Sequence, residues 1–258
     1  MNEAELLFSE VLGCDRIDLY LDKAKLVDKD KLRLISSVLK RRIKGEPIQH
    51  ILGKTEFMGL EFKVNPDVLI PRPETEILVE TALKYINKEK GTRILDLGTG
   101  SGCIAVSLYK NSVDSAIDAS DVSNKALEVA GENACLNNAK INFIQSDLFN
   151  ALGYKEYDMI ISNPPYIVSA EIRKLQPELR FEPVLALDGG TDGLDFYRRI
   201  IVGAPDYLKN GGWLILEIGF GQKSAIEKIF LDSGRFEIAG VIKDYNNIAR
   251  VIIARKAD

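Results

Sequence analysis

The stretch 92-TRILDLGTGSGCIAVSLYKN-111 reads as a strand, a glycine-rich turn and a helix in immediate succession. It begins with a short apolar run, places glycine at positions 98, 100 and 102, and continues from Cys103 with apolar residues at helical spacing. A buried strand that turns directly into a helix is the first half of a βαβ unit, which builds parallel sheets. The sequence around residue 100 therefore predicts an α/β fold.

The alternation of strand and helix continues toward the C-terminus. The segments are SAIDASDVS (115–123), NKALEVAGENACLNN (124–138), INFIQSDL (141–148), YDMIISN (157–163) and, after a long insert, GWLILEIG (212–219). Such alternation is typical of a parallel sheet that helices cover on both faces. Residues 236–256 offer two strands joined only by a turn, which indicates an antiparallel pair. We therefore expect a doubly wound, seven-stranded, mostly parallel sheet with an antiparallel edge.

The beginning of the chain has a different pattern, which predicts a small N-terminal helical domain over residues 1–54. In the segment 28–45, apolar residues recur at three- and four-residue steps and share one helical face. Residues 55–72 read as a hairpin or an extended linker. A helix is expected near Pro73, since proline suits a first helical turn and two acidic residues follow it. This helix opens the main domain, residues 73–258.

Composition and charge exclude several classes of protein. The 258 residues carry a formal net charge of −4 and a pI of about 5.3, so no global positive field draws the chain onto nucleic acid or an anionic membrane. Acidic residues stand where a signal peptide needs positive charge, and no run reaches the ~18 apolar residues of a membrane span. Three widely spaced cysteines suggest neither disulfides nor a zinc site. We expect a cytoplasmic protein without a metal.

The glycine turn suggests a nucleoside-bearing ligand. Ligands of doubly wound sheets lie at the carboxyl ends of the strands, where glycines let the backbone approach them closely. The second strand ends at Asp121, which could accept hydrogen bonds from ribose hydroxyls. A dinucleotide fingerprint needs its third glycine at position 103, where this chain has Cys103. The G-x-G-x-G spacing favours S-adenosylmethionine; the alternative is that the glycines only make a turn and Asp121 caps a helix.

A second turn, Asn163-Pro164-Pro165-Tyr166, follows an apolar strand. Each proline holds the residue before it extended and lacks an N–H. The turn therefore presents two acceptors, the Asn163 side-chain oxygen and the Pro164 carbonyl, which match the two N–H bonds of a planar amino group. Tyr166 adds a flat face on which an amide or a base can stack. The alternative is a rigid surface turn without a chemical role.

With these two motifs the chain resembles the class I S-adenosylmethionine-dependent methyltransferases, and within them the release factor glutamine methyltransferases, the PrmC/HemK group. The resemblance covers nearly the whole chain and rests on GEPIQHILGKTEFMGLEFKVN (45–65), LIPRPETE (69–76), ILDLGTGSGCIAVSL (94–108), ISNPPYI (161–167), RFEPVLALDGGTDGLDFYRRI (180–200) and GGWLILEIGFGQ (211–222). The glycine loop and the proline turn are shared by many methyltransferases. PRPETE and EPVLALDGGTDGLDFYR are far more restricted and indicate this family.

The resemblance implies an enzyme that transfers a methyl group from S-adenosylmethionine to the side-chain amide nitrogen (N5) of the glutamine in the Gly-Gly-Gln motif of bacterial peptide chain release factors. The other product is S-adenosylhomocysteine. The cofactor residues that it implies are Gly98, Thr99, Gly100, Ser101, Gly102, Asp121 for the ribose, Asp147 and Leu148 near the adenine, and Asn163. The substrate residues are Asn163, Pro164, Pro165 and Tyr166, of which Asn163, Pro164 and Tyr166 are catalytic. An N-terminal helical domain would help to hold the release factor. We expect a monomer that forms no stable complex with nucleic acid.

Two other functions fit the same motifs. A methyltransferase acting on adenine N6 or guanine N2 could use the same acceptors, but it needs a flipped or single-stranded base and a positive channel. A non-catalytic binding protein could keep the fold. The acidic balance disfavours the first, and the presence of both motifs disfavours the second.

Several charged groups have two interpretations. The basic cluster Lys40–Lys44 either complements a helix C-terminus or contacts an acidic patch on the release factor. Arg72 and Glu74 either line the cofactor site or start a helix. Glu182 and the loop 188–195 either lie over the substrate or form a turn before a helix. The single histidine, His50, is interpreted as structural.

Overall fold

The computed structural model describes residues 3–21, 27–87, 91–153 and 156–257. Its large sheet contains the strands β3 (Arg93–Leu97), β4 (Ala116–Asp121), β5 (Ile141–Gln145), β6 (Tyr157–Ser162), β7 (Leu208–Glu217), β8 (Phe236–Lys243) and β9 (Ala249–Lys256). The strand order is β5-β4-β3-β6-β7-β9-β8. The pairs from β5 to β7 are parallel, whereas β9 runs antiparallel to both β7 and β8. The predicted seven-stranded sheet with an antiparallel edge is confirmed.

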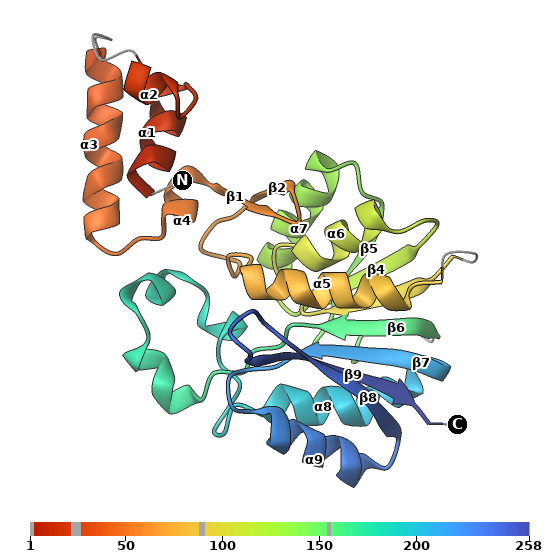
Figure 1. Ribbon diagram of the computed structural model, residues 1–258. Helices are drawn as coiled ribbons and strands as arrows, with labels where there is room; N and C mark the ends of the chain where they lie inside the picture. Colours follow the sequence, from red (N-terminus) through yellow and green to blue (C-terminus); the bar gives the residue numbers. More distant parts are fainter. Residues whose placement is uncertain (1–2, 22–26, 88–90, 154–155, 258) are drawn as a thin grey trace.

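Helices cover both faces of this sheet, as Figure 1 shows. They are α5 (Pro73–Tyr85), α6 (Cys103–Asn111), α7 (Asn124–Leu136), α8 (Asp195–Gly203) and α9 (Lys223–Ser233). Because neighbouring side chains of a strand point to opposite faces, Ile94 and Ile161 pack with α5, α6 and α7. Leu95 and Ile160 instead pack with α8 and α9. Helix α9 was not predicted from the sequence, although Gly234 in the left-handed conformation ends it in the usual way.

The N-terminal unit is helical, as predicted for this part of the chain, and continues into a hairpin. Its elements are α1 (Glu3–Leu12), α2 (Asp18–Leu21), α3 (Lys29–Ile43), α4 (Ile48–Leu52), β1 (Lys54–Phe57) and β2 (Leu60–Lys63). The side chain of Asp28 accepts a hydrogen bond from Lys31 N at the start of α3. Residues 1–2 and 22–26 of the predicted helical segment lie outside the described residues. The short helix α4 was not predicted.

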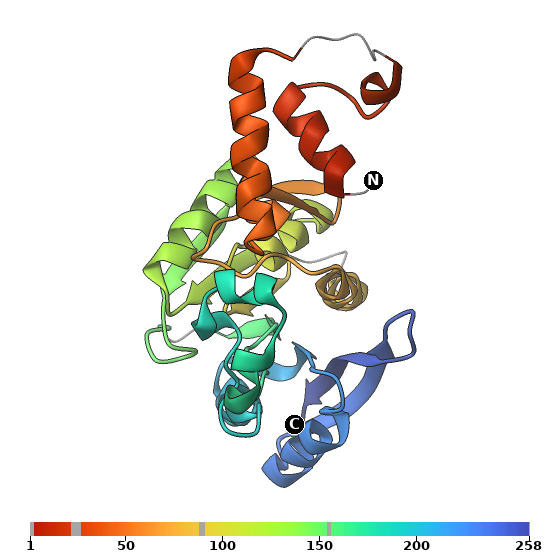
Figure 2. The ribbon, with the colours of Figure 1, turned by 90° about the vertical axis from the view of Figure 1, so that its left-hand side faces the viewer.

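The basic cluster at the end of α3 makes intramolecular ion pairs. Arg41 pairs with Glu46, and Arg42 pairs with Glu3 of α1 and with Glu178 of the insert between β6 and α8. The insert consists of short 3-10 helices, η1 (Ser169–Lys174), η2 (Pro177–Phe181) and η3 (Val184–Ala186), and a further turn, η4 (Ala204–Asp206), follows α8. In Figure 2 this insert lies beneath the N-terminal helices. Arg42 therefore ties the N-terminal unit to the insert.

His50 of α4 is buried, with 6% of its surface exposed. Neither of its ring nitrogens has a hydrogen-bond partner among the described residues. Burial lowers the pKa of His50, and the charges of Arg72 and Arg41 add to this effect while Glu46 opposes it.

Within the described residues, no helix is both long enough and apolar enough to cross a membrane.

Candidate active site

The glycine loop lies between β3 and α6, at the carboxyl end of β3, an inner strand of the sheet. Gly98 has φ +71° and Gly100 has φ +54°, a conformation that side chains disfavour. A Cβ atom on either residue would meet nothing within 4 Å, so both backbones border open space. The amides of Gly98 and Thr99 donate to the carbonyl oxygen of Ser120, at 2.8 and 2.9 Å, and hold the loop against β4.

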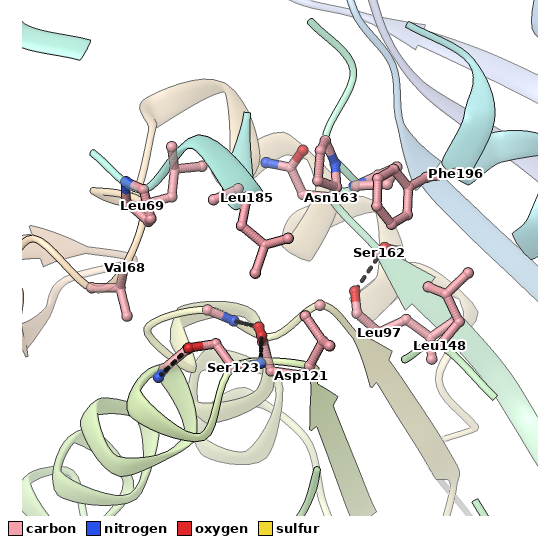
Figure 3. A pocket seen from close by; sticks show the side chains of 18 of the residues that line it. Val68, Leu69, Leu97, Asp121, Ser123, Leu148, Ser162, Asn163, Leu185 and Phe196 are labelled. Carbon is pink, nitrogen blue, oxygen red and sulfur yellow. Dashed lines mark hydrogen bonds between the residues drawn. The ribbon is translucent and has the colours of Figure 1, made fainter. Parts of the chain in front are cut away.

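Asp121 at the end of β4 faces this loop. One carboxylate oxygen accepts a hydrogen bond from Gly100 N and the other accepts one from Ser123 N, both at 2.9 Å (Figure 3). Burial raises the pKa of Asp121, and these backbone donors oppose the shift. The cap of α7 is supplied by the side chain of Ser123, which accepts from Ala126 N. Asp121 is therefore not the helix cap, and its oxygens keep lone pairs for a further donor.

A pocket opens between the glycine loop, Asp121 and the proline turn. Its lining includes six of the residues expected to bind the cofactor, which are Gly98, Gly100, Asp121, Asp147, Leu148 and Asn163. The other three, Thr99, Ser101 and Gly102, do not line it. Thr99 and Ser101 are buried, and the Thr99 hydroxyl donates to Asp96 at 2.6 Å. These residues shape the loop from beneath.

The expected adenine end of the pocket is apolar. Leu148, Leu97 and Phe196 lie near one another at one end of the view in Figure 3. The carboxylate of Asp147 accepts two hydrogen bonds from Arg199, both at 2.7 Å, so its charge is already paired. Phe196 was not identified from the sequence. It belongs to α8, 33 residues beyond Asn163, and only the packing of α8 against the sheet brings it to the pocket.

The proline turn follows β6 directly and lies beside the glycine loop. The Ser162 hydroxyl donates to the carbonyl oxygen of Leu97 at 2.7 Å and joins the ends of β6 and β3. Asn163 and Pro164 line the first pocket and also a second, adjoining one. Tyr166 lines the second pocket, whereas Pro165 lines the first. The turn therefore separates the expected cofactor pocket from a neighbouring cavity.

The second pocket has charged walls. Its lining includes Arg72, Glu74, Glu217 and Arg250. Arg72 and Glu74 also occupy the start of α5, so they start a helix and line a pocket, but not the expected cofactor pocket. Glu217 and Arg250 were not identified from the sequence, because each lies within an apolar strand segment whose neighbours point into the core.

Glu182 is buried and ties the linker to the insert. Its carboxylate accepts a hydrogen bond from Ile70 N at 3.1 Å and pairs with Arg72. In the loop 188–195, Asp188 accepts from the Ser169 hydroxyl at 2.6 Å and from Gly190 N at 2.9 Å. Both features organise the insert that forms one wall of the second pocket.

Two buried carboxyl groups near the pockets have raised pKa values. Burial raises the pKa of Asp96 to about 7, and the negative charge of Asp121 adds to this shift. Burial also raises the pKa of Glu217 to about 7, while hydroxyl groups and Arg250 oppose the shift. The surroundings of both carboxyl groups therefore disfavour their charged forms.

The first pocket fits the chemistry of S-adenosylmethionine. The Oδ1 atom of Asp96 is buried beneath the loop and has no hydrogen-bond partner among the described residues. A cationic ligand in this pocket would favour the charged forms of Asp96 and Asp121, because an opposite charge nearby lowers the pKa of a carboxyl group. The exposed loop backbone, a carboxylate that can accept from ribose hydroxyls and an apolar end also match the chemistry of the methionine, ribose and adenine parts.

Known proteins share this fold. Residues 73–177 match the family described as methyltransferase small domain, and residues 1–53 match the PrmC N-terminal domain. A methyltransferase from Pyrococcus furiosus superposes with a TM-score of 0.60 at 17% identity, over 90% of this chain and 100% of that one, which shows a common fold. The sheet and the two motifs define a class I S-adenosylmethionine-dependent methyltransferase.

Curated relatives narrow this class. The release factor glutamine methyltransferase of Thermodesulfovibrio yellowstonii is 45% identical over 100% of this chain and 93% of its own length. That of Geobacter sulfurreducens is 44% identical over 98% of this chain and 88% of its own. This chain belongs to the release factor glutamine methyltransferase family.

Proposed function

We propose that this protein transfers a methyl group from S-adenosylmethionine to the N5 amide nitrogen of the glutamine in the Gly-Gly-Gln motif of peptide chain release factors. Family membership and the names of the relatives support this substrate. The structural observation that carries the proposal is the position of Asn163 and Pro164, which border both pockets. A group held by these two acceptors lies where the cofactor pocket meets its neighbour.

The chemistry follows from this position. An amide nitrogen is a poor nucleophile because its lone pair is delocalised. Two acceptors, the Asn163 side-chain oxygen and the Pro164 carbonyl, would hold both N–H bonds and make the lone pair available toward the first pocket. S-adenosylmethionine supplies an electrophilic methyl group when bound there. Fixing two reactants in line can lower the activation barrier by up to ~7–11 kcal/mol.

Charge develops on the acceptor nitrogen during transfer, and the residues of the turn stabilise it. Preorganised acceptors in a site of low dielectric lower the barrier without reorganising. Tyr166 borders the second pocket, and burial raises its pKa, so its ring can pack on a planar amide while its hydroxyl stays protonated. The positively charged nitrogen loses its proton to water only after the methyl transfer. No general base is therefore needed during the transfer step.

The N-terminal unit, residues 1–54, and the linker, 55–72, would hold the body of the release factor. The linker residue Leu69 lines both pockets, and Arg72 lines the second. These positions support a role for the linker in guiding the bound factor from the N-terminal unit to the proline turn. We propose that the protein works as a monomer in the cytoplasm and does not bind nucleic acid stably.

Mass spectrometry tests the proposal. Purified release factor is incubated with the protein and S-adenosylmethionine, and the added mass is mapped by fragmentation. A methyl group on the motif glutamine is expected, and a factor whose motif glutamine is replaced by alanine should gain none. If the factor stayed unmodified while the protein still bound the cofactor, the release factor would be rejected as the substrate. Structured RNA would then be tested as the acceptor.

We also expect turnover to be independent of metal ions, because transfer to a nitrogen held between two acceptors needs no Lewis acid. Assays with and without a chelator should give equal rates. A rate that falls with the chelator and returns on adding a divalent ion would contradict this mechanism.

A further inference from the structure

A chain of two hydrogen bonds runs from the side chain of Asn163 through Thr75 to Glu217. Its amide nitrogen, Nδ2, donates to the hydroxyl of Thr75 in α5 at 3.1 Å. The same hydroxyl donates to Oε2 of Glu217 at the end of β7 at 2.8 Å. Thr75 and Glu217 are 3% and 2% exposed, so water does not compete for these bonds.

The direction of this chain of hydrogen bonds follows from the chemistry of its members. An ionised carboxylate can only accept, and a hydroxyl has one proton to donate. Once Thr75 donates to Glu217, it can only accept from Asn163. The Asn163 amide must therefore turn Nδ2 toward Thr75, which leaves Oδ1 as the group available to the pocket.

We propose that Thr75 and Glu217 are positioning residues that fix the orientation of the Asn163 amide, so that its oxygen and not its NH2 group meets the acceptor nitrogen. An amide rotated by half a turn would present a donor to the substrate N–H bonds and repel them. This inference rests on the proposed function for its effect on turnover, but the orientation itself is a property of the free protein.

Protonation of Glu217 removes the constraint. A carboxylic acid can donate to the Thr75 hydroxyl, which is then free to donate its own proton to Oδ1 of Asn163. Burial raises the pKa of Glu217 to about 7, so this change falls within an accessible range. The titratable and charged groups around Glu217 are Glu74 of α5, Cys103 of α6, Tyr166 of the turn, Tyr197 of α8 and Arg250 of β9. Glu74 raises the pKa of Glu217, whereas Arg250 and the hydroxyls of Thr75 and Tyr166 lower it.

The chain offers a matched set of threonine variants. Thr75→Val removes the hydroxyl at almost constant volume, and Thr75→Ser keeps it. Thr81→Val makes the same change six residues further along α5, at a site that is 2% exposed and whose hydroxyl has no partner among the described residues. Thr75→Val should lower turnover at least ~10-fold, the scale of one lost orienting hydrogen bond, with an unchanged dissociation constant for S-adenosylmethionine. Thr75→Ser and Thr81→Val should stay near the wild-type rate.

Glu217 is tested through the pH profile. Wild-type turnover should fall as pH drops below about 7, because the neutral acid no longer fixes the direction of the hydrogen bonds. Glu217→Gln can still accept from Thr75 through its amide oxygen, so it should retain much of the activity and lose this acidic limb. An acidic limb of Glu217→Gln that coincides with that of the wild type would contradict the role of Glu217.

A readout independent of activity keeps the two proposals separate. In NMR spectra, the signal of the Asn163 side-chain NH2 group is assigned by its loss in Asn163→Ala. Its protons should be protected from exchange with solvent in the wild type and in Thr81→Val. Thr75→Val should lose this protection while its melting temperature stays close to that of Thr81→Val. The positioning role would be overturned if Thr75→Val turned over substrate at the wild-type rate, or if its Asn163 signal stayed as protected as in the wild type. An inactive wild type with the signal behaving as expected would reject only the proposed substrate.

Discussion

Asn163 is the residue on which the proposed reaction depends most directly. Replacing Asn163 by Ala removes one of two acceptors from a desolvated amino group, which should cost ~1–3 kcal/mol and lower turnover about ten- to hundredfold. The dissociation constant for the cofactor should change little, since the glycine loop and Asp121 remain. Single-turnover kinetics and calorimetry measure the two quantities. Unaltered turnover would remove Asn163 from the acceptor role.

Asp121 should behave in the opposite way. Its carboxylate lines the first pocket and also holds Gly100 N, so Asp121→Ala loses both a ribose partner and a constraint on the loop. Cofactor binding should weaken by about tenfold or more, which corresponds to one charge-assisted hydrogen bond. Isothermal titration with S-adenosylhomocysteine would measure this change. An unchanged dissociation constant would mean that Asp121 shapes the loop but does not touch the ligand.

At the scale of elements, one side chain joins three segments. Asn133 of α7 accepts from Lys63 N at 2.7 Å and donates to the carbonyl oxygens of Lys63 and Ser101, both at 2.9 Å. Asn133→Ala would leave these buried and part-buried backbone groups without this partner and should lower the free energy of unfolding by about 2–4 kcal/mol. Asn137→Ala, which removes a more exposed bond to the same hairpin, should cost less than about 1 kcal/mol. Equal costs in denaturant melts would contradict this role.

Packing of α6 against α7 also depends on a glycine. Gly102 has φ +81°, and a Cβ atom there would lie 3.1 Å from the Cβ of Ala130. Gly102→Ala should therefore destabilise the protein by about 2 kcal/mol, from backbone strain and overpacking. Gly131 lies next to Ala130 within α7, and a Cβ atom there would meet nothing within 4 Å. Gly131→Ala should therefore stabilise the protein by about 0.5–1 kcal/mol. Thermal unfolding of both variants gives the comparison, and a loss in both would refute the steric argument.

At the scale of the whole molecule, buried acids make stability depend on pH. The folded-state pKa values of Asp96 and Glu217 are raised to about 7, above the ordinary value near 4. The unfolded state therefore loses its protons first as pH rises, and the free energy of unfolding should fall between pH ~4 and ~7, by on the order of 3 kcal/mol per group. Acids whose pKa is lowered, such as Asp188 and Asp192, act below this window.

Asp96→Asn removes one of these titrations. The variant should be the more stable protein at pH 8, and its stability should fall less steeply between pH 4 and 7 than that of the wild type. Urea unfolding across this range measures the slope. Parallel curves for the two proteins would show that Asp96 does not titrate in the folded state.

Local patterns predicted the elements that carry their own signals. Helix α6 begins at Cys103, directly after the last loop glycine, and α5 begins at Pro73, because a proline and acidic residues favour a first turn. The edge pair β8 and β9 followed from two strands joined by a turn. The short helices of the insert were not predicted, since 3-10 turns around prolines have no clear periodicity.

The glycine loop and the proline turn could be proposed from the sequence because each is a contiguous segment whose geometry is set locally by glycine or proline. The second half of the site could not. Thr75 and Glu217 are 142 positions apart and meet only because α5 packs against the end of β7. Tertiary packing buries both and gives the Asn163 side chain its hydrogen-bond partner Thr75, which is a long-range consequence of the sheet order that no local pattern contains.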